Sequence, residues 1–481
     1  MCEQTEAVLR AYLHRTLGVQ EDGWGIRPSG VSGRGVFATR SLAPGDLIFH
    51  DRPVVWGPRA KSDKPMCAAC HRLGRVSQCD AGCYLPICSP ECAASSLHAQ
   101  ECRMVRESMS LPDGGWRLDL LGTVTPLRCL FLNPGDREVV QCLQGNQGKI
   151  HGIEVDLLKQ HMKENLSKED EDWMRLCCLV MDTNAFEFLK VFSDGGQTSL
   201  RGLYPLAAVM NHECSPNSCH VYNADGVMKV FASRPIAAGE EVTTSYSSLL
   251  WSTPIRRLNL ARTKHFLCRC IRCSDPTEFG SMLSCLPCTD PSCRGLLLPY
   301  HPLTAQSTWY CDCCQAEVSP KQAAQLQATQ GMVLQTLSVA QPPAVAQWLA
   351  GQHMPAQGQV VVQLKTRLVW QLGHDAGFTW QELSQEMLDL KETCCRDVLL
   401  VLDTLRFGHC RMKGLILLEL HGSLCEKQKR KHLGGVSDQI IMEEARAILA
   451  TARVILQDDA AAQTELNLQT EEHHRIEALS T

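Results

Sequence analysis

The stretch NHECSPN, residues 211–217, interrupts sequence that otherwise has the composition of a protein core. The run LYPLAAVM at 203–210 precedes it, and the strand-like run CHVYNADGVMKVFA at 219–232 follows it. Asparagine, histidine and cysteine gain nothing from burial unless each finds a partner. The stretch therefore predicts a site whose other members come from distant parts of the chain.

Cysteines are the first candidates for those members, because the chain contains 27 of them in 481 residues. Two clusters, at 67–102 and 268–314, have the short gaps that are typical of zinc ligands. In a secreted chain such cysteines would form disulfides, but the first 25 residues lack the apolar segment of a signal peptide. We therefore expect reduced thiols that either bind zinc or lie buried.

The motif Cys268-x-Cys270-x2-Cys273 supplies three zinc ligands, whereas a closed structural site has four. Cys214 is the candidate for the fourth ligand, because its own surroundings offer no second metal-spaced pair apart from Cys219. A zinc ion shared in this way would join NHECSPN to a segment about fifty residues further along the chain.

The first cluster contains eight ligands in four pairs: Cys67 and Cys70, Cys79 and Cys83, Cys88 and Cys92, His98 and Cys102. Eight ligands suit two tetrahedral zinc ions, and so short a segment needs them because it cannot build a core of its own. We expect interleaved pairing, with Cys67, Cys70, Cys88 and Cys92 on one ion and the other four on the second. Buried reduced thiols are the alternative.

A further zinc ribbon is expected at 285–314. The pairs Cys285-x2-Cys288 and Cys311-x2-Cys314 have the required spacing, with Cys293 and Cys313 as substitutes. Free buried cysteines are the alternative here too.

Charge and hydropathy exclude two classes of partner. Lys and Arg number 47 against 52 for Asp and Glu, so no global basic field favours nucleic acid. No apolar run approaches the roughly 18 residues that a membrane span needs. We expect neither a membrane segment nor strong nucleic-acid binding.

Local patterns predict short strands between helical regions. Residues 6–17 form a helical stripe, and 24–56 read as strands joined by the turn Ala43-Pro44-Gly45-Asp46. A mainly helical region follows the first cysteine cluster, short strands return from about 181, and a second turn lies at 237–240. After Cys314 almost everything is helix-like, most clearly SDQIIMEEARAILATARVIL, which Ser437 or Asp438 can cap.

Taken in order, these features resemble the SMYD family, in which a SET methyltransferase domain is split by a MYND zinc finger. The matching segments are SGRGVFA at 32–38, the eight ligands at 67–102, TNAFEF at 183–188, GLYPLAAVMNHECSPN at 202–217, GEEVTTSY at 239–246 and HFLCRCIRC at 265–273. The run RCSDPTEFG at 272–280 resembles the arthropod-type branch of that family.

The resemblance implies an α+β fold, a SET-type β fold of short strands with an inserted MYND finger, a post-SET zinc segment and an α-helical C-terminal domain. The expected boundaries are an N-terminal helix at 1–23, SET segments at 24–62 and 181–250, the MYND finger at 63–105, a helical insertion at 106–180, the post-SET segment at 251–315 and the helical domain at 316–481.

The resemblance also assigns a binding site for S-adenosylmethionine. Its residues are Gly33, Arg34, Gly35, Asn184, Asn211, His212, Tyr246 and Phe266. Each has a plainer interpretation in isolation: a tight turn for the glycines, a local cap for Asn184, a turn for Asn-His and core packing for the aromatic residues.

Tyr246 is the catalytic candidate, since its hydroxyl can orient a lysine nitrogen, and Tyr204 is a further candidate for lining the same pocket. The sequence departs from the family pattern at Lys264, which stands where better-known members have an aromatic residue in the wall of the lysine channel. A lysine there would block or recharge the channel.

The implied function is S-adenosylmethionine-dependent methylation of protein lysines, histone or non-histone, in transcriptional regulation. The alternative is a catalytically weak SET and MYND scaffold that acts as a corepressor. Zinc is the second cofactor, with two ions in the MYND finger, one in the post-SET segment and one in the ribbon. Protein or peptide lysines and a proline-rich peptide at the MYND finger are the expected partners. The expected location is cytoplasm and nucleus, with KQKRKH at 427–432 either an import signal or a solvated helix end.

Overall fold

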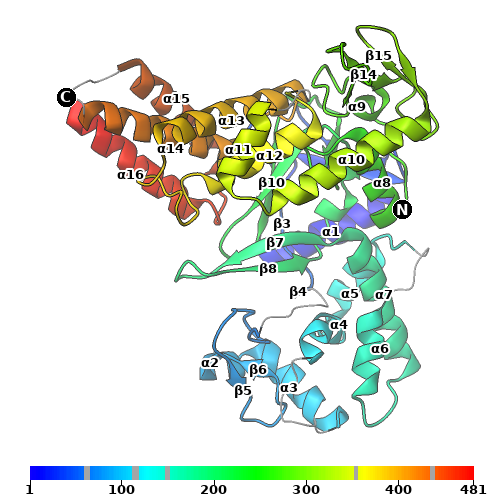
Figure 1. Cartoon of the computed structure of the whole chain (residues 1–481). Coiled ribbons are helices and arrows are strands. Elements are labelled where there is room, and N and C mark those ends of the chain that lie inside the picture. Colours follow the sequence, from blue (N-terminus) through cyan, green and yellow to red (C-terminus); the bar gives the residue numbers. More distant parts are fainter. Residues whose placement is uncertain (59–64, 111–118, 147–151, 352–355, 434–438, 481) are drawn as a thin grey trace.

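The computed structural model describes residues 1–58, 65–110, 119–146, 152–351, 356–433 and 439–480. Three small sheets form its centre (Figure 1). The first contains β1 (Trp24–Pro28), β2 (Arg34–Ala38), β12 (Glu241–Thr244) and β9 (Asn211–His212) in that order; the second contains β10 (Ser218–Tyr222), β11 (Met228–Ala232) and β3 (Leu47–Asp51); and the third contains β4 (Trp56–Gly57), β8 (Gln197–Gly202) and β7 (Phe186–Val191).

Strands from both ends of the SET-like region pair with each other. β12 runs antiparallel to β2 and parallel to β9, so Thr243 lies opposite Asn211 and Thr244 opposite His212. Buried residues such as Val36, Phe49 and Val230 pack between the sheets and against α1 (Cys2–Leu17). This helix confirms the expected N-terminal helix.

Both predicted turns are present, and each has a glycine that needs a left-handed backbone. The amide of Asp46 donates to the carbonyl of Ala43, with Gly45 at φ 91°, and Glu240 and Gly239 repeat the arrangement with φ 83°. A positive φ at the third position is the signature of a type II turn, which few residues other than glycine adopt.

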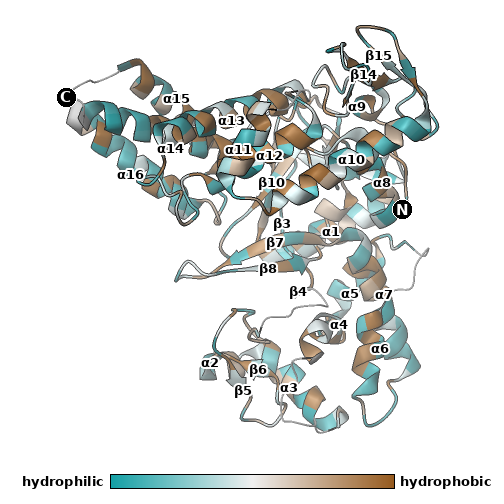
Figure 2. Cartoon of the chain, in the orientation of Figure 1, coloured by the Kyte–Doolittle hydropathy of each residue, from teal (hydrophilic) through white to brown (hydrophobic). Residues whose placement is uncertain are grey.

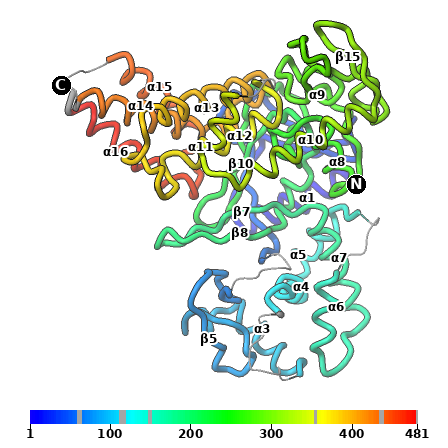
Figure 3. Tube along the Cα trace, viewed as in Figure 1, coloured from blue at the N-terminus to red at the C-terminus, as the bar shows by residue number. Residues whose placement is uncertain are grey.

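The described parts of residues 65–184 lie together on one side of the sheets (Figure 3). They comprise β5 (Ser77–Gln78), β6 (Pro86–Ile87), α2 (Pro90–Ala93), α3 (Ser96–Ser108), the 3-10 helix η1 (Asp119–Thr123), α4 (Val124–Cys129), α5 (Pro134–Gln141), α6 (Ile153–Gln160) and α7 (Lys168–Asn184). α7 extends to Asn184, so the strands begin a few residues later than expected, at Phe186.

One of the remaining elements precedes β9, and the others follow it. They are η2 (Ala207–Val209) just before it, then α8 (Thr253–Thr263), α9 (Ile271–Ser274), β13 (Leu286–Pro287), β14 (Leu296–Pro299), β15 (Trp309–Cys311), β16 (Glu317–Val318), α10 (Pro320–Ser338), α11 (Pro342–Gly351), α12 (Gln359–Gln371), α13 (Gln385–Thr404), α14 (Arg411–Leu433), α15 (Gln439–Leu456) and α16 (Gln463–Ser480). β13 to β16 form one antiparallel sheet.

The C-terminal helices confirm the helical character expected after Cys314. They carry both apolar and polar residues (Figure 2), and their apolar side chains form a second large core around Leu388, Val398 and Leu449. The proposed caps Ser437 and Asp438 lie outside the described residues. None of the helices in the described ranges is both long enough and apolar enough to cross a membrane.

Candidate cofactor site and metal centres

Cys214 lies immediately beyond β9 and meets the three downstream cysteines, as predicted. Its Sγ atom is 3.9 Å from Sγ of Cys268 and 3.5 Å from Sγ of Cys273, and Cys270 completes a group whose sulfurs all lie within 4.8 Å of one another. Four sulfurs around a zinc ion at about 2.3 Å lie roughly 3.8 Å apart. The four thiols therefore fit one tetrahedral zinc ion.

Two buried arginines and a buried glutamate surround this group, and sequence reasoning missed their role. Arg256 Nε donates to Cys214 Sγ at 3.2 Å, while Arg272 Nη1 donates to the carbonyl of Cys214 at 3.0 Å. Both guanidinium groups also pair with Glu278, at 2.7 and 2.8 Å. One carboxylate against two guanidinium groups leaves a net positive charge, which would partly offset the negative charge of four thiolates around a zinc ion.

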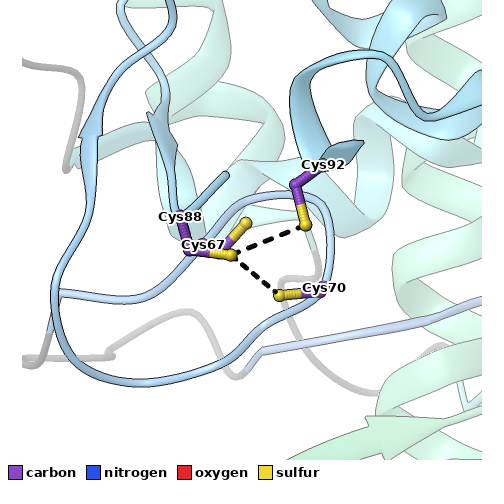
Figure 4. A group of neighbouring side chains, drawn as sticks. All are labelled: Cys67, Cys70, Cys88 and Cys92. Carbon is purple, nitrogen blue, oxygen red and sulfur yellow. Dashed lines mark hydrogen bonds between the residues drawn. The ribbon is translucent and has the colours of Figure 1, made fainter. Parts of the chain in front are cut away.

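The two zinc sets expected in the first cluster also form, with the interleaved pairing. Cys67, Cys70, Cys88 and Cys92 converge from one turn, from the residue after β6 and from α2 (Figure 4), and Cys88 Sγ lies 3.5 Å from the sulfurs of both Cys70 and Cys92. The second set is Cys79, Cys83, His98 and Cys102, and all four are buried.

The helices that carry these ligands begin at side-chain caps. Ser89 accepts a hydrogen bond from the amide of Cys92, and Ser95 accepts one from the amide of His98. Capping fixes the first turn of a short helix and so fixes the direction of the ligand within it.

In the ribbon the prediction of Cys285 as a ligand is wrong, and Cys293 takes its place beside Cys288, Cys311 and Cys314. Cys285 is only 2% exposed and lies outside the group. By contrast, the sulfurs of Cys288 and Cys293 accept backbone hydrogen bonds from Asp290 at 3.4 Å and Gly295 at 3.3 Å. Hydrogen bonds of this kind stabilise a thiolate. In the sequence, the Cys-Arg-Gly turn at 293–295 is the feature that could have identified Cys293 as the ligand.

The expected cofactor loop lies against Asn211. The side-chain amide of Asn211 donates to the carbonyls of Ser32 at 3.2 Å and Arg34 at 3.1 Å, and to Glu241 Oε1 at 2.6 Å. Asn211 therefore holds the loop to β9 and β12. The Arg34 side chain points away from the site, since its guanidinium donates to Thr5 Oγ1 and to the carbonyl of Cys142.

Both glycines of the loop are required by local geometry. Gly33 has φ 52°, and a Cβ atom on Gly35 would lie 2.1 Å from Glu241 Oε1. Gly33 is exposed, so its backbone is accessible to a ligand that makes polar contacts, whereas Gly35 is buried against Glu241.

Asn184 lies at the end of α7 rather than at a strand end. Its side-chain amide donates to the carbonyls of Gln144 at 2.6 Å and Val180 at 2.9 Å. The Gln144 side chain lies beside Gly33, about 3.6 Å from where a Cβ atom on that glycine would be. Gln144, which the sequence did not single out, thus connects two of the expected cofactor residues.

Three aromatic rings form a corner next to the zinc group. The ring centroid of His212 lies 5.3 Å from that of Tyr246 and 5.8 Å from that of Phe266. Phe266 remains 36% exposed. Phe266 is two residues from Cys268, so a bound zinc ion would hold it in place. An exposed aromatic face beside a bare backbone loop suits a flat heterocycle such as adenine.

Tyr246 is fixed at both ends of the residue. Its amide donates to His212 Nδ1 at 3.0 Å, and its hydroxyl donates to the carbonyl of Met210 at 2.5 Å. Burial, together with the charge of Glu241, raises the pKa of Tyr246 to about 12. The residue is therefore a neutral phenol at physiological pH, and its oxygen can accept a hydrogen bond from an incoming amine.

Tyr204 does not line this pocket. It is fully buried, its hydroxyl donates to the carbonyl of Gly226 at 2.7 Å, and its ring packs against Phe186 and Phe188. It is a core residue of the third sheet.

Lys264 does reach Tyr246. Its Nζ atom lies 5.3 Å from the centroid of the Tyr246 ring and donates to the carbonyl of Thr183 at the end of α7. Burial lowers the pKa of Lys264. The Lys264 side chain is thus hydrogen-bonded to a backbone carbonyl instead of projecting freely into solvent.

A cleft of about 430 Å³ opens beside the end of β12 and the residues that follow it. Residues of β10 and its neighbours Thr244, Ser245 and Ser247 to Leu249 form one wall, and residues of the C-terminal helical region, including Trp370, Phe407 and Met412, form the other. These C-terminal residues could not be predicted from the sequence, because no local motif marks them. Phe407 and Met412 lie about 160 residues further along the chain than the segment they face across the cleft.

Comparisons with known proteins agree with this arrangement. A model of the SET domain matches residues 33–247. The chain is 33% identical over 418 residues to the SET domain-containing protein SmydA-8, isoform B, of Drosophila melanogaster, which covers 83% of this chain and 91% of that protein. It is 28% identical over 273 residues to the histone-lysine N-methyltransferase SMYD3 of Mus musculus, covering 52% of this chain and 61% of that protein. The chain therefore belongs to the SMYD family of SET-domain proteins, in its arthropod-type branch.

Proposed function

We propose that this protein methylates lysine side chains of other proteins, with S-adenosylmethionine as the methyl donor. The observation that carries the proposal is the corner formed by His212, Tyr246 and Phe266, together with Asn211, the neighbour of His212 in β9, which holds the glycine loop. Relatives named histone-lysine N-methyltransferases support the same chemistry.

Different residues of the site would bind the cofactor and orient the substrate lysine. Gly33 to Gly35, held by Asn211, would offer backbone polar groups to the cofactor, and Phe266 would cover its adenine ring. When bound, S-adenosylmethionine supplies an electrophilic methyl group. Tyr246 would accept a hydrogen bond from the lysine nitrogen and so direct its lone pair toward that methyl group.

The substrate nitrogen must arrive neutral, since an ammonium has no lone pair, and a free lysine has a pKa of about 10.4. Burial in the channel favours the neutral amine. The Lys264 ammonium beside Tyr246 would further favour the neutral form of the substrate amine, because it would repel a substrate ammonium.

Methyl transfer from isotopically labelled cofactor to histones and cell-extract proteins tests the proposal. Tyr246→Phe removes the hydroxyl that orients the amine, and we expect at least a hundredfold slower transfer. Tyr300→Phe, at an exposed tyrosine of the ribbon, is the control and should leave the rate unchanged. Equal rates for the two variants, or no transfer by the wild type, would reject the catalytic assignment.

A scaffold without efficient catalysis is the second candidate, and the position of Lys264 favours it. A cation at 5.3 Å from the Tyr246 ring narrows the space in which a substrate lysine must fit. In that case the wild type would bind S-adenosylhomocysteine without transferring methyl groups, and Lys264→Ala, which removes the cation from this space, would restore transfer.

We further propose two zinc ions in a MYND finger at 63–105, which would bind proline-rich peptides, and one ion in each of the two later cysteine groups. Cytoplasm and nucleus remain the proposed locations, and transcriptional regulation the proposed setting. None of the 27 cysteines forms a disulfide in the structure. The basic run at 427–432 supports import only weakly, because Lys427, Lys429 and Arg430 form ion pairs with acidic residues.

A further inference from the structure

A fifth group of metal-ligand side chains lies far from the proposed active site, inside the C-terminal helices. His421 and Cys425 are one turn apart on α14, so they project from the same face, and His473 approaches them from α16. Their exposed fractions are 0%, 2% and 3%. Neither the SET chemistry nor the two cysteine clusters uses these residues.

The three donor atoms are as close together as ligands of one ion. His421 Nε2 lies 3.2 Å from His473 Nδ1 and 3.3 Å from Cys425 Sγ. Around a tetrahedral zinc ion with ordinary bond lengths, two nitrogens lie roughly 3.3 Å apart and a nitrogen and a sulfur roughly 3.6 Å apart. The observed separations are within a few tenths of an ångström of these values.

Neighbouring side chains direct lone pairs into the centre of the group. Gln469 Oε1 lies 2.8 Å from His421 Nδ1, and the other end of the Gln469 amide donates to Glu465 at 2.8 Å, which fixes the oxygen toward the histidine. An amide oxygen only accepts, so Nδ1 of His421 carries the hydrogen and Nε2 presents its lone pair inward. This is how outer partners orient histidines that bind metals.

Glu477 lies beside His473, with its Oε1 atom 3.3 Å from Nε2, in a geometry that does not make a hydrogen bond. The carboxylate favours a hydrogen on Nε2 and leaves Nδ1 to face His421. Two inward lone pairs at 3.2 Å repel each other unless a cation lies between them. A proton on His473 would meet that need, but it would not explain why a thiol also points at the same atom.

We propose that His421, Cys425 and His473 bind a zinc ion that fastens the C-terminal helix α16 to α14. Two imidazoles and one thiolate are a ligand set that zinc accepts, and water can fill the fourth position. Met442 of α15 and Ile476 pack beside Cys425 and form an apolar wall for the site. The site would thus connect three helices at the end of the chain.

Zinc content of the purified full-length protein, measured by mass spectrometry, tests the proposal. We expect five zinc ions per chain, one for each group, and one fewer in both His473→Ala and Cys425→Ser. His474→Ala removes the adjacent, exposed histidine and should keep all five. Cys425→Ser changes a single atom, so the test remains valid if His473→Ala fails to fold.

A second measurement detects the structural consequence. Hydrogen exchange in α16 should become at least tenfold faster in the Cys425→Ser variant, because the helix loses its metal contact, and should be unchanged in His474→Ala. Equal zinc content in the wild type and Cys425→Ser would overturn the proposal and identify a protonated His473 at the centre of the group. Neither outcome depends on methyl transfer.

Discussion

At the scale of single residues, the site depends on a few atoms that hold one another in place. Glu241 accepts hydrogen bonds from Asn211 at 2.6 Å and from Ser29 at 2.8 Å, and it fills the space that a side chain at Gly35 would need. The motif Gly-Arg-Gly predicted a backbone loop from the sequence. The partner carboxylate could not be predicted, because Glu241 is about two hundred residues away and charged residues usually lie in solvent.

Replacement of Gly35 by alanine tests this contact. The new methyl group would displace Glu241 and, through it, Asn211, which we expect to weaken binding of S-adenosylhomocysteine at least tenfold and to cost about 1–3 kcal/mol of unfolding free energy. Calorimetry and thermal unfolding measure the two effects. Gly30→Ala is the matched control, since a Cβ atom there meets nothing within 4 Å, and an equal response of both variants would contradict this role.

At the scale of elements, zinc ligands connect segments that have little core of their own. The spacing of cysteines predicted both ion sets of the first cluster and the partnership of Cys214 with the group at 268–273, because ligand spacing is a local property of the sequence. It failed at Cys285, where the spacing is right but the side chain is buried away from the ribbon. Spacing alone does not reveal which way a side chain points.

Cys214→Ser is expected to affect the zinc content and the cofactor site together. Loss of one ligand should remove one zinc ion per chain and release the segment that carries Phe266, so that affinity for S-adenosylhomocysteine falls at least tenfold. Metal analysis and calorimetry on the same sample check both effects. Cys219→Ser is the control, since Cys219 donates to the carbonyl of His409 and is not part of the group. Unchanged zinc content would mean that Cys214 is an ordinary buried cysteine and not a zinc ligand.

At the scale of the whole molecule, the C-terminal helices lie against the sheets (Figure 1), and residues of this region form one wall of the cleft. Ser215, beside the zinc ligand Cys214, donates to the carbonyl of Leu405 at 2.9 Å, and the amide of His409 donates to the carbonyl of Ser233 at 2.7 Å. Helical periodicity predicted that these helices exist. Their docking could not be predicted, since it rests on backbone contacts between segments about 190 residues apart, which any side-chain pattern can provide.

Calorimetric titration of the whole protein with S-adenosylhomocysteine tests the proposed cofactor site most directly. We expect one binding event per chain, and a 5- to 150-fold loss of affinity in Phe266→Ala, which corresponds to about 1–3 kcal/mol for stacking of one base on an aromatic ring. The control is Leu267→Ala, whose side chain is adjacent and 56% exposed, and it should bind as the wild type does. Absence of binding to the wild type, or equal affinities of the two variants, would contradict a cofactor site at the corner of Asn211, His212 and Phe266.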